Sequence, residues 1–147
     1  MPAKRPNGAN LNDLMRECFR VNRGLMDASR QLTEGTGITG AQWGVLTALG
    51  QGDEPRTVAE TARQMALARQ SVQRVADVLA ENGLVEYLPN PDDKRAKLAE
   101  VTRAGRRLLL KLEKQQQKWI ADIAADCSDA DINTAFRLVQ KIRQQMG

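Results

Sequence analysis

The chain has 147 residues, of which 41% are hydrophobic and 27% are charged, so a globular fold of ordinary size is predicted and a mainly disordered or collagen-like chain is excluded. Its formal net charge of +4 suits a polyanionic partner. The sequence contains no histidine, which excludes Ser-His and Cys-His catalytic arrangements and removes the commonest zinc ligand.

Membrane, metal and enzyme functions find no support in the sequence. No apolar run approaches the ~20 residues that span a bilayer, and residues 1–10 are not followed by the apolar core of a signal peptide, so a cytoplasmic protein is expected. The two cysteines, Cys18 and Cys127, are far apart and do not resemble a disulfide framework or a metal cluster. With no nucleotide-binding glycine motif either, we predict no enzyme, no cofactor and no metal.

The N-terminal third is predicted to form an arm and a long amphipathic helix. Residues 1–10 are rich in Pro, Gly and Asn, which is typical of a flexible arm. Asn10 or Asn12 is placed to cap the helix that follows and ends near Gly35. Its apolar positions recur in three- and four-residue steps: Leu11, Leu14, Met15, Cys18, Val21, Leu25, Met26 and Leu32.

Three shorter helices are predicted next. Thr39 is placed to cap a helix over residues 41–49, and Thr57 with Glu60 forms a capping box for a helix that ends at a tight bend over residues 65–67. A third helix is predicted from about Ala68 to residue 82. Its apolar residues face inward, while its outer side is polar and cationic and carries Arg69, Gln70, Ser71, Gln73, Arg74 and Asp77.

A basic hairpin is predicted directly after this helix. Residues 84–88 and 98–101 are strand-like, and the segment between them is rich in turn-forming and cationic residues. A cationic helix beside such a β-wing is how a winged helix-turn-helix binds a DNA duplex, with the helix in the major groove and the wing along the backbone or minor groove. The sequence therefore predicts a winged helix-turn-helix lobe over residues 36–103.

Both ends of the chain are predicted to be helical and striped with apolar residues. One long helix is expected from Arg103 to about Ala125, and a last helix follows Ser128, its predicted cap. Because such stripes need a surface to cover them, we predict that residues 11–34 and 104–147 form a helical dimerisation region of a twofold homodimer. The alternative is that these helices pack back on their own domain. The expected fold is mainly α with a small β-wing.

Three motifs, in this order, resemble the MarR family of bacterial winged-helix transcriptional regulators. Residues 38–46 are similar to the family segment Thr-x-x-Gln-x-x-x-Leu, and residues 82–86 to the Gly-Leu-Val end of its recognition helix. Asp93-Lys94-Arg95 followed by residues 101–105 resembles the wing signature Asp-x-Arg and Leu-Thr-x-x-Gly. Three positions depart from the family pattern: Thr61 and Val101 each stand where Leu is common, and Tyr87 where Arg is common.

The resemblance implies a homodimer that reads a pseudo-palindromic operator in double-stranded DNA, most often as a repressor, and an aromatic or phenolic effector bound between lobe and dimer arm. Arg95 at the wing tip is expected in the minor groove, and Asp93 is expected to orient a neighbouring arginine as a wing support. The predicted DNA-binding residues are Arg69, Gln70, Ser71, Gln73, Arg74, Lys94, Arg95, Arg63, Thr39 and Thr57. For the two threonines of this set, helix capping alone is the alternative explanation.

Regulation is the least specified part of the prediction. Candidate lining residues for an effector pocket are Met15, Phe19, Met26 and Trp43, for each of which core packing is the alternative. Cys18 resembles the sensing cysteine of the peroxide-responsive branch of the family, and the alternative is a buried small hydrophobe. The competing functions are an effector-independent architectural DNA-binding protein, a redox-responsive regulator, and a winged helix that binds protein rather than DNA.

Overall fold

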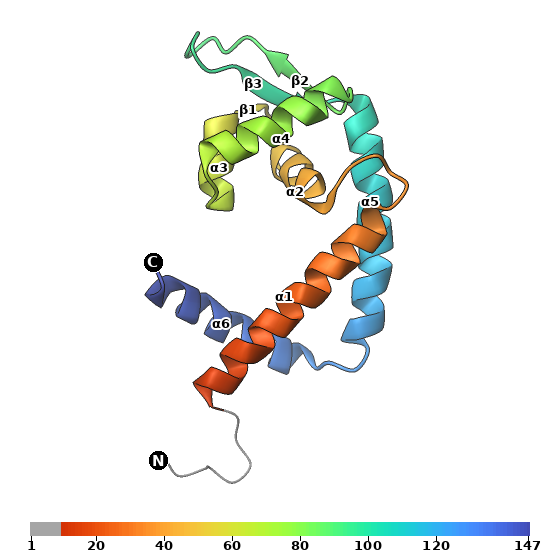
Figure 1. Cartoon of the computed structure of the whole chain (residues 1–147), viewed down its shortest axis with the longest axis vertical. Helices are drawn as coiled ribbons and strands as arrows, with labels where there is room; N and C mark the ends of the chain where they lie inside the picture. The colour runs from red at the N-terminus through yellow and green to blue at the C-terminus, as the bar shows by residue number, and fades with distance from the viewer. Residues whose placement is uncertain (1–9) are drawn as a thin grey trace. The chain divides into compact units, whose positions relative to one another are not determined.

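The computed structural model describes residues 10–147, so all but the last residue of the predicted N-terminal arm lies outside the described residues. The chain divides into two compact units, one ending at Leu112 and the other spanning Glu113–Gly147. The fold is mainly α with one small sheet, as predicted (Figure 1). The elements in chain order are α1 (Leu11–Thr33), α2 (Gly40–Leu49), β1 (Arg56–Thr57), α3 (Val58–Met65), α4 (Arg69–Glu81), β2 (Val85–Leu88), β3 (Leu98–Val101), α5 (Arg103–Ala124) and α6 (Asp129–Gln145).

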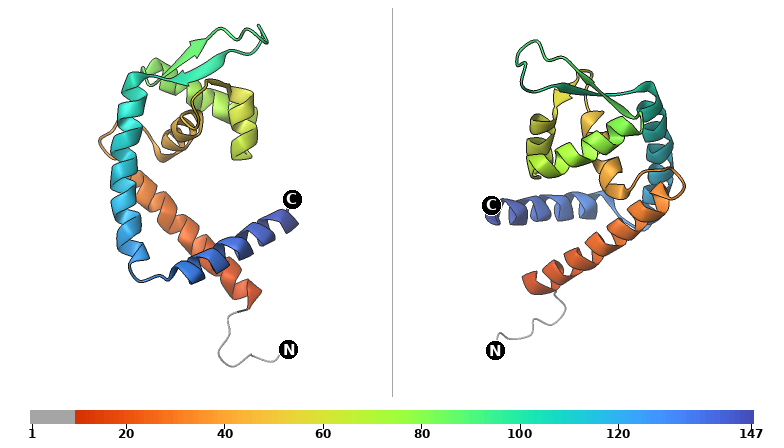
Figure 2. Two further views of the ribbon diagram at one scale, coloured as in Figure 1. Left: turned by 180° about the vertical axis from the view of Figure 1, so that it is seen from behind. Right: turned by 45° about the horizontal axis from the view of Figure 1, so that its top comes forward.

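The sheet has three antiparallel strands in the order β1-β3-β2. Val85 pairs with Val101 and Leu88 with Leu98, so β2 and β3 form the predicted hairpin, and the loop between them projects beyond the sheet (Figures 1 and 2). The strand β1 was not predicted, because two residues are too few to show an alternating pattern. Its Arg56 pairs with Ala99 of β3, which attaches the start of α3 to the wing.

The helix ends are fixed by local hydrogen bonds. Thr39 Oγ1 accepts a hydrogen bond from Gln42 N at 3.2 Å at the start of α2, and Ser128 caps α6 in the same way. At the end of α4, Gly83 has a φ of +72° and Leu84 N donates to Leu79 O at 2.9 Å. This C-terminal cap uses the left-handed conformation that glycine adopts without strain. Leu84 thus belongs to the cap rather than to the predicted strand.

The turn between α3 and α4 is closed by a residue in the left-handed conformation. Ala66 has a φ of 54°, and Leu67 N donates to Ala62 O at 3.0 Å. The tight bend predicted over residues 65–67 is therefore a helix cap, in which the chain reverses within a few residues.

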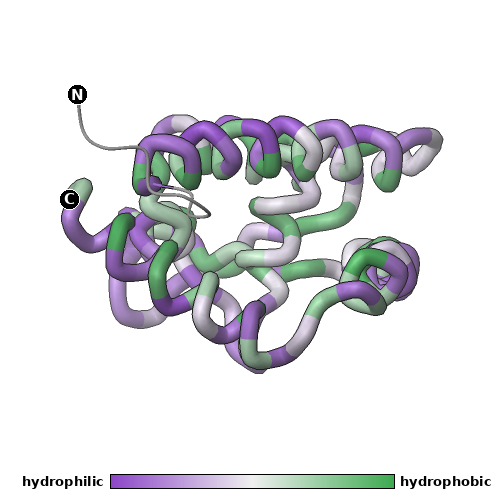
Figure 3. The backbone as a smooth tube through the Cα atoms, turned by 90° about the horizontal axis from the view of Figure 1, so that it is seen from below, coloured by the Kyte–Doolittle hydropathy of each residue, from purple (hydrophilic) through white to green (hydrophobic). Residues whose placement is uncertain are grey.

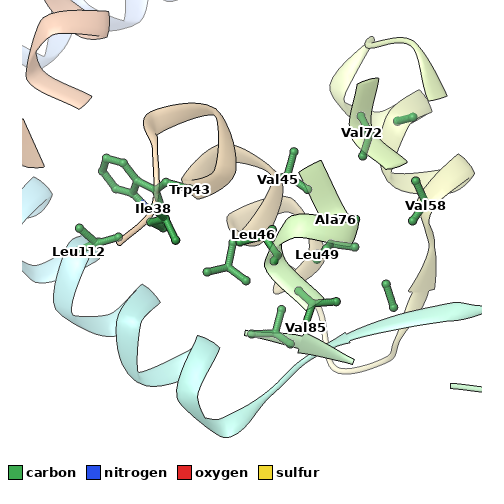
Figure 4. Packing of buried hydrophobic residues seen from close by; sticks show 14 residues of the cluster. Ile38, Trp43, Val45, Leu46, Leu49, Val58, Val72, Ala76, Val85 and Leu112 are labelled. Atoms are coloured by element: carbon green, nitrogen blue, oxygen red, sulfur yellow. The ribbon is translucent and has the colours of Figure 1, made fainter. Parts of the chain in front are cut away.

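One hydrophobic core fills the unit that ends at Leu112 (Figure 4). Leu46 of α2, Leu79 of α4 and Leu112 of α5 are fully buried in it. Thr61, which stands where the family commonly has Leu, is also fully buried, and its Oγ1 donates to Thr57 O at 3.1 Å. Its hydroxyl is thus satisfied within its own helix, which avoids the cost of an unpaired buried polar group.

The end of the wing is tied to the end of α4 by the second half of the wing signature. Thr102 N donates to Leu84 O at 3.0 Å, Thr102 Oγ1 donates to Gly83 O at 2.7 Å, and Gly105 N donates to Thr102 Oγ1 at 3.1 Å. Gly105 is buried where a Cβ atom would overlap the carbonyl oxygen of Leu84. The Thr-x-x-Gly segment therefore determines how closely α5 approaches the end of α4.

Candidate nucleic-acid interface

The start of α4 presents polar and cationic side chains to the surface. Arg69, Gln70, Ser71 and Arg74 are exposed, and Gln73 is half-buried. The N-cap position holds Ala68, which supplies no side-chain hydrogen bond, and the first turn contains no acid. The first amides of the helix and its positive dipole end are thus unopposed by a local carboxylate, which favours an anionic partner.

A cleft of about 300 Å³ separates α4 from the wing and collects cationic side chains from both. Arg69 and Gln73 line it from α4, and Arg95 and Lys97 line it from the wing. The single acid among its lining residues is Asp77. The structure thus brings together cations that lie 26 positions apart in the sequence, from Arg69 to Arg95. Lys97 was not singled out from the sequence, although it belongs to the cationic segment between the two strands.

The wing tip is a tight turn that displays its cations. Lys94 and Arg95 are exposed. Asp93 Oδ1 accepts a hydrogen bond from Arg95 N at 2.9 Å, and Asn90 Oδ1 accepts one from Asp92 N at 3.0 Å. The contact of Asp93 is therefore with the backbone of Arg95, and it fixes the turn from which the guanidinium extends.

The other predicted phosphate-binding residues divide between two places. Thr57 and Arg63 line a second hollow, which Asp92, Asp93 and Ala96 of the wing border on the other side. Thr39 lies apart from the wing, at a hollow of about 990 Å³ between the end of α1 and the start of α2. Both threonines cap helices in the structure, and Thr57 Oγ1 accepts from Glu60 N at 3.1 Å.

The capping box at α3 has a stabilising role that can be measured. The backbone N–H of Thr57 donates to the Glu60 carboxylate and lowers the pKa of that carboxyl below its ordinary value of 4.5, and the Thr57 hydroxyl and Arg63 act in the same direction. Because the folded pKa is depressed, this contribution to stability is present above the unfolded pKa and is lost as pH falls through the folded value.

We predict that Thr57→Ala lowers the free energy of unfolding by about 1 kcal/mol at neutral pH, because one N-terminal amide of α3 loses its acceptor. Thr57→Ser keeps the acceptor and should be nearly neutral. Urea unfolding followed by circular dichroism measures both variants. In wild type the stability should also decline on acidification; a Thr57→Ala protein as stable as Thr57→Ser would show that the cap contributes nothing.

A cluster that the sequence did not predict connects α4 to β2. Gln73 Nε2 donates to Asp77 Oδ1 at 2.9 Å and to the Tyr87 hydroxyl oxygen at 3.0 Å, and the Tyr87 hydroxyl donates to Asp77 Oδ1 at 2.6 Å. Burial raises the pKa of Tyr87, and its hydrogen bond to Asp77 raises that pKa further. The only sequence signal was the departure of Tyr87 from the family pattern, which predicts a missing cation and not a hydrogen-bonded cluster.

The predicted effector-pocket residues are dispersed. Trp43 lies in the hydrophobic core, whereas Phe19 and Met26 are exposed and Met15 is half-buried on α1. Of the four, Met26 alone lines the hollow between α1 and α2. Cys18 is half-buried and Cys127 is exposed, and both are free thiols.

Within residues 10–147, no group of three or more His, Cys, Asp or Glu side chains is arranged to hold a metal ion. Over the same part of the chain, no helix combines the length and apolar character required to cross a membrane.

The fold and this cationic surface together define a winged helix-turn-helix, and comparison with known proteins gives its family. Residues 36–96 match the model of the MarR family. The structure of CouR from Rhodococcus jostii RHA1 bound to p-coumaroyl-CoA aligns with a TM-score of 0.79 and 25% identity, covering 88% of this chain and 91% of that chain. The winged-helix region of this chain is thus similar to the MarR family, as the resemblance of the wing signature predicted.

Two relatives extend the comparison by sequence. An uncharacterized protein of Mycobacterium tuberculosis is 41% identical over 73 residues, a match that spans 50% of this chain and only 50% of that protein. The putative transcriptional regulatory protein for the hcr operon of Thauera aromatica is 27% identical over 131 residues, 86% of this chain and 78% of that protein. The Thauera protein is described as a regulatory protein and not as an enzyme, which agrees with the prediction that this chain is not an enzyme.

Proposed function

We propose that the protein is a sequence-specific transcriptional regulator that binds double-stranded DNA through α4 and the wing. The observation that carries this proposal is the cleft between α4 and the wing, which is lined by Arg69, Arg95 and Lys97. A recognition helix in the major groove and a wing on the flanking backbone or minor groove place these cations against phosphates and base edges. The one acid of the cleft, Asp77, is engaged by Tyr87 and Gln73.

The second part of the proposal is a homodimer that reads a pseudo-palindromic operator. Apolar side chains remain exposed along α1, and also along α5 and α6 of the second unit, where Ile132, Phe136 and Val139 lie one helical turn apart. Figure 3 shows hydrophobic and hydrophilic residues alternating within the turns of the helices. Exposed apolar faces of this extent favour association with a second copy, and a twofold dimer supplies two reading heads.

The third part is that a small molecule regulates DNA binding, with the protein acting as a repressor that the ligand releases. Support comes from the hollow of about 990 Å³ between α1 and α2, which Met26 and Ile38 line with apolar surface. A ligand there would act by binding more tightly to a conformation that does not fit the operator. The CouR structure, bound to p-coumaroyl-CoA, shows that a protein of this fold holds a small molecule. An architectural role without an effector is the competing proposal.

The test of DNA binding is fluorescence anisotropy on promoter fragments, including the region upstream of the gene for this protein. The affinity of wild type should fall steeply between about 50 and 200 mM salt, because each phosphate that is neutralised contributes about −0.9 to the slope of log K against log salt. Arg95→Ala should bind more weakly and reduce this slope by about one unit.

Arg20→Ala is the matched control for Arg95→Ala. Arg20 is exposed on α1 and, within residues 10–147, pairs with Glu17 alone, at 2.9 Å, so its loss removes the same charge from the chain at little cost in stability. The control should bind DNA as wild type does. A slope near zero for wild type would contradict the proposed function, and equal binding by Arg95→Ala and Arg20→Ala would contradict the role of the wing.

A further inference from the structure

The first half of α5 carries a row of exposed cations that the proposed DNA surface does not use. This row, called here the α5 ridge, consists of Arg103, Arg106, Arg107 and Lys111. The whole of α5 contains six cations and two acids, so its net charge of +4 equals that of the entire chain. The hairpin extends away from the start of α5 to the wing tip, and the cleft beside α4 has no lining residue from α5 (Figure 1). The α5 ridge is therefore a separate cationic surface.

The α5 ridge lies on the side of the helix that faces away from the core. At about 100° per residue, Arg103, Arg107 and Lys111 fall within about 80° of one another around the helix. The buried residues Gly105 and Leu112 lie about 160–180° from Arg103, on the opposite side. From Arg103 to Lys111 the helix rises by about 12 Å. One partner can therefore contact these side chains at the same time.

Exposed arginines on a helix are most simply explained as a solvated face, and α1 shows how this chain builds such a face. The three arginines that form salt bridges on α1 each pair with an acid three residues earlier. On α5, the residue three or four positions before Arg106, Arg107 and Lys111 is instead another arginine. Within residues 10–147, no carboxylate forms a salt bridge with the α5 ridge. The pattern of α1 is thus absent from α5.

This arrangement of charges opposes the stability of the helix. Like charges one turn apart repel each other, as Arg103 and Arg107 do. Arg103 and Arg106 also lie in the first turn of α5, which contains no acid and where the positive end of the helix dipole disfavours cations. A partner with negative charge would remove both penalties, because it would neutralise the α5 ridge.

Leu110 indicates that this partner is a protein rather than a nucleic acid. Its side chain is 65% exposed, and it lies about 20° from Arg103 around the helix, next to Lys111 in the sequence. A phosphate backbone is contacted by cations and hydrogen-bond donors and offers no apolar group to cover a leucine. An amphipathic protein segment offers carboxylates and apolar side chains together.

We propose that the α5 ridge and Leu110 form a docking surface for an acidic, amphipathic helix of a partner protein. Carboxylates spaced by three and four residues on that helix match the spacing of the cations on α5, so the two rows can form charge-assisted hydrogen bonds. Apolar side chains between the carboxylates would cover Leu110. The surface gives the protein a partner besides DNA, bound through different residues.

The experiment measures binding of a fluorescein-labelled peptide of Glu-Ala-Leu-Glu repeats to the full chain by fluorescence anisotropy. A control peptide has Ser in place of each Leu and the same charge. Wild type should bind the leucine peptide about tenfold more tightly than the serine peptide, because only the former covers Leu110. Added salt should weaken the binding of both peptides.

Two double variants test the charges of the α5 ridge. Arg103→Gln combined with Arg107→Gln should lower the affinity for the leucine peptide about tenfold, because two charge-assisted contacts are lost. Arg16→Gln combined with Arg20→Gln is the matched control. It removes two exposed arginines with the same spacing from α1, and it should bind the peptide as wild type does.

Leu110→Ser tests the apolar contact. This variant should bind the leucine and serine peptides with equal affinity, because the group that distinguishes them is gone. Since Leu110 is exposed, the substitution should leave the fold intact, which circular dichroism checks. A Leu110→Ser protein that is folded and keeps the wild-type preference for the leucine peptide would contradict the proposal.

The remaining outcomes identify other occupants of the surface. Equal affinity of the two double variants for the leucine peptide would overturn the proposal. It would also be overturned if the Arg103→Gln, Arg107→Gln protein lost operator affinity and salt dependence, since the α5 ridge would then bind nucleic acid. A monomeric mass for that variant in light scattering would show that a second copy covers the ridge, and would overturn it as well. The peptide assay contains no DNA, so its result does not depend on the DNA-binding function proposed above.

Discussion

Gly105→Ala is expected to destabilise the protein by about 3 kcal/mol, because a methyl group at this position has no space in a tightly packed site. The Cβ would overlap the carbonyl oxygen of Leu84 and contact Val101, and the oxygen belongs to the backbone and cannot rotate away. Relief requires α5 to move from the end of α4, which breaks the hydrogen bonds of Thr102 to Gly83 and Leu84. Urea unfolding of both proteins measures the difference.

Gly24→Ala is the matched control for this substitution. Gly24 lies inside α1, and a Cβ there would have no heavy atom within 4 Å. Alanine in a helix interior is more favourable than glycine by about 1 kcal/mol, so the control should be slightly more stable than wild type. If Gly105→Ala were as stable as Gly24→Ala, the close approach of α5 to Leu84 would not exist in solution.

Gly105 shows which features of the fold a sequence pattern predicts and which it does not. The segment Val101-Thr102-Arg103-Ala104-Gly105 carries the family resemblance, and in the structure its Thr102 and Gly105 hold the wing to the end of α4. A pattern identifies such a segment without giving its physical reason, because that reason is a contact with Leu84, which lies outside the motif.

The helices and the hairpin were predictable because each depends on local signals. The caps at Thr39, Thr57 and Ser128 and the apolar periodicity of α4 act within a few residues, and all are present in the structure. The strand β1 and the Tyr87 cluster depend on partners far along the chain, which a local pattern does not contain. Trp43 illustrates the same limit, since its burial in the core depends on elements as distant as Leu112.

The candidate interface also contains features that the sequence predicts and features that depend on distant contacts. The cations of α4 and the wing were predicted individually, since charge and turn residues are visible in the sequence. Their convergence on one cleft, with Lys97 among them, depends on how the hairpin folds back beside α4. The hydrogen bonds of Gln73 with Asp77 and Tyr87 depend on the further contact between α4 and β2. The residues of the interface were therefore predictable from the sequence, whereas the orientations of their side chains were not.

Phe136→Glu on α6 is expected to convert a homodimer into a monomer and to weaken operator binding about a hundredfold or more. Phe136 is 61% exposed in the single chain, between Ile132 and Val139 on one face of the helix. A charge placed in the apolar centre of an interface must be desolvated without a partner, which opposes association. A monomer then binds one half-site, so the gain from two linked contacts disappears.

Thr134→Glu separates this effect from that of the added charge. Thr134 is exposed on the same helix, and its hydroxyl donates to Ala130 O of its own helix at 2.9 Å. At 100° per residue, it lies about 160° around the helix from Phe136, on the side away from the apolar face. Light scattering should therefore give twice the chain mass of 16.3 kDa for Thr134→Glu and the single mass for Phe136→Glu. If both variants have twice the chain mass, the dimer contact lies elsewhere. If Thr134→Glu is dimeric and keeps wild-type affinity, operator affinity depends on the apolar face of α6.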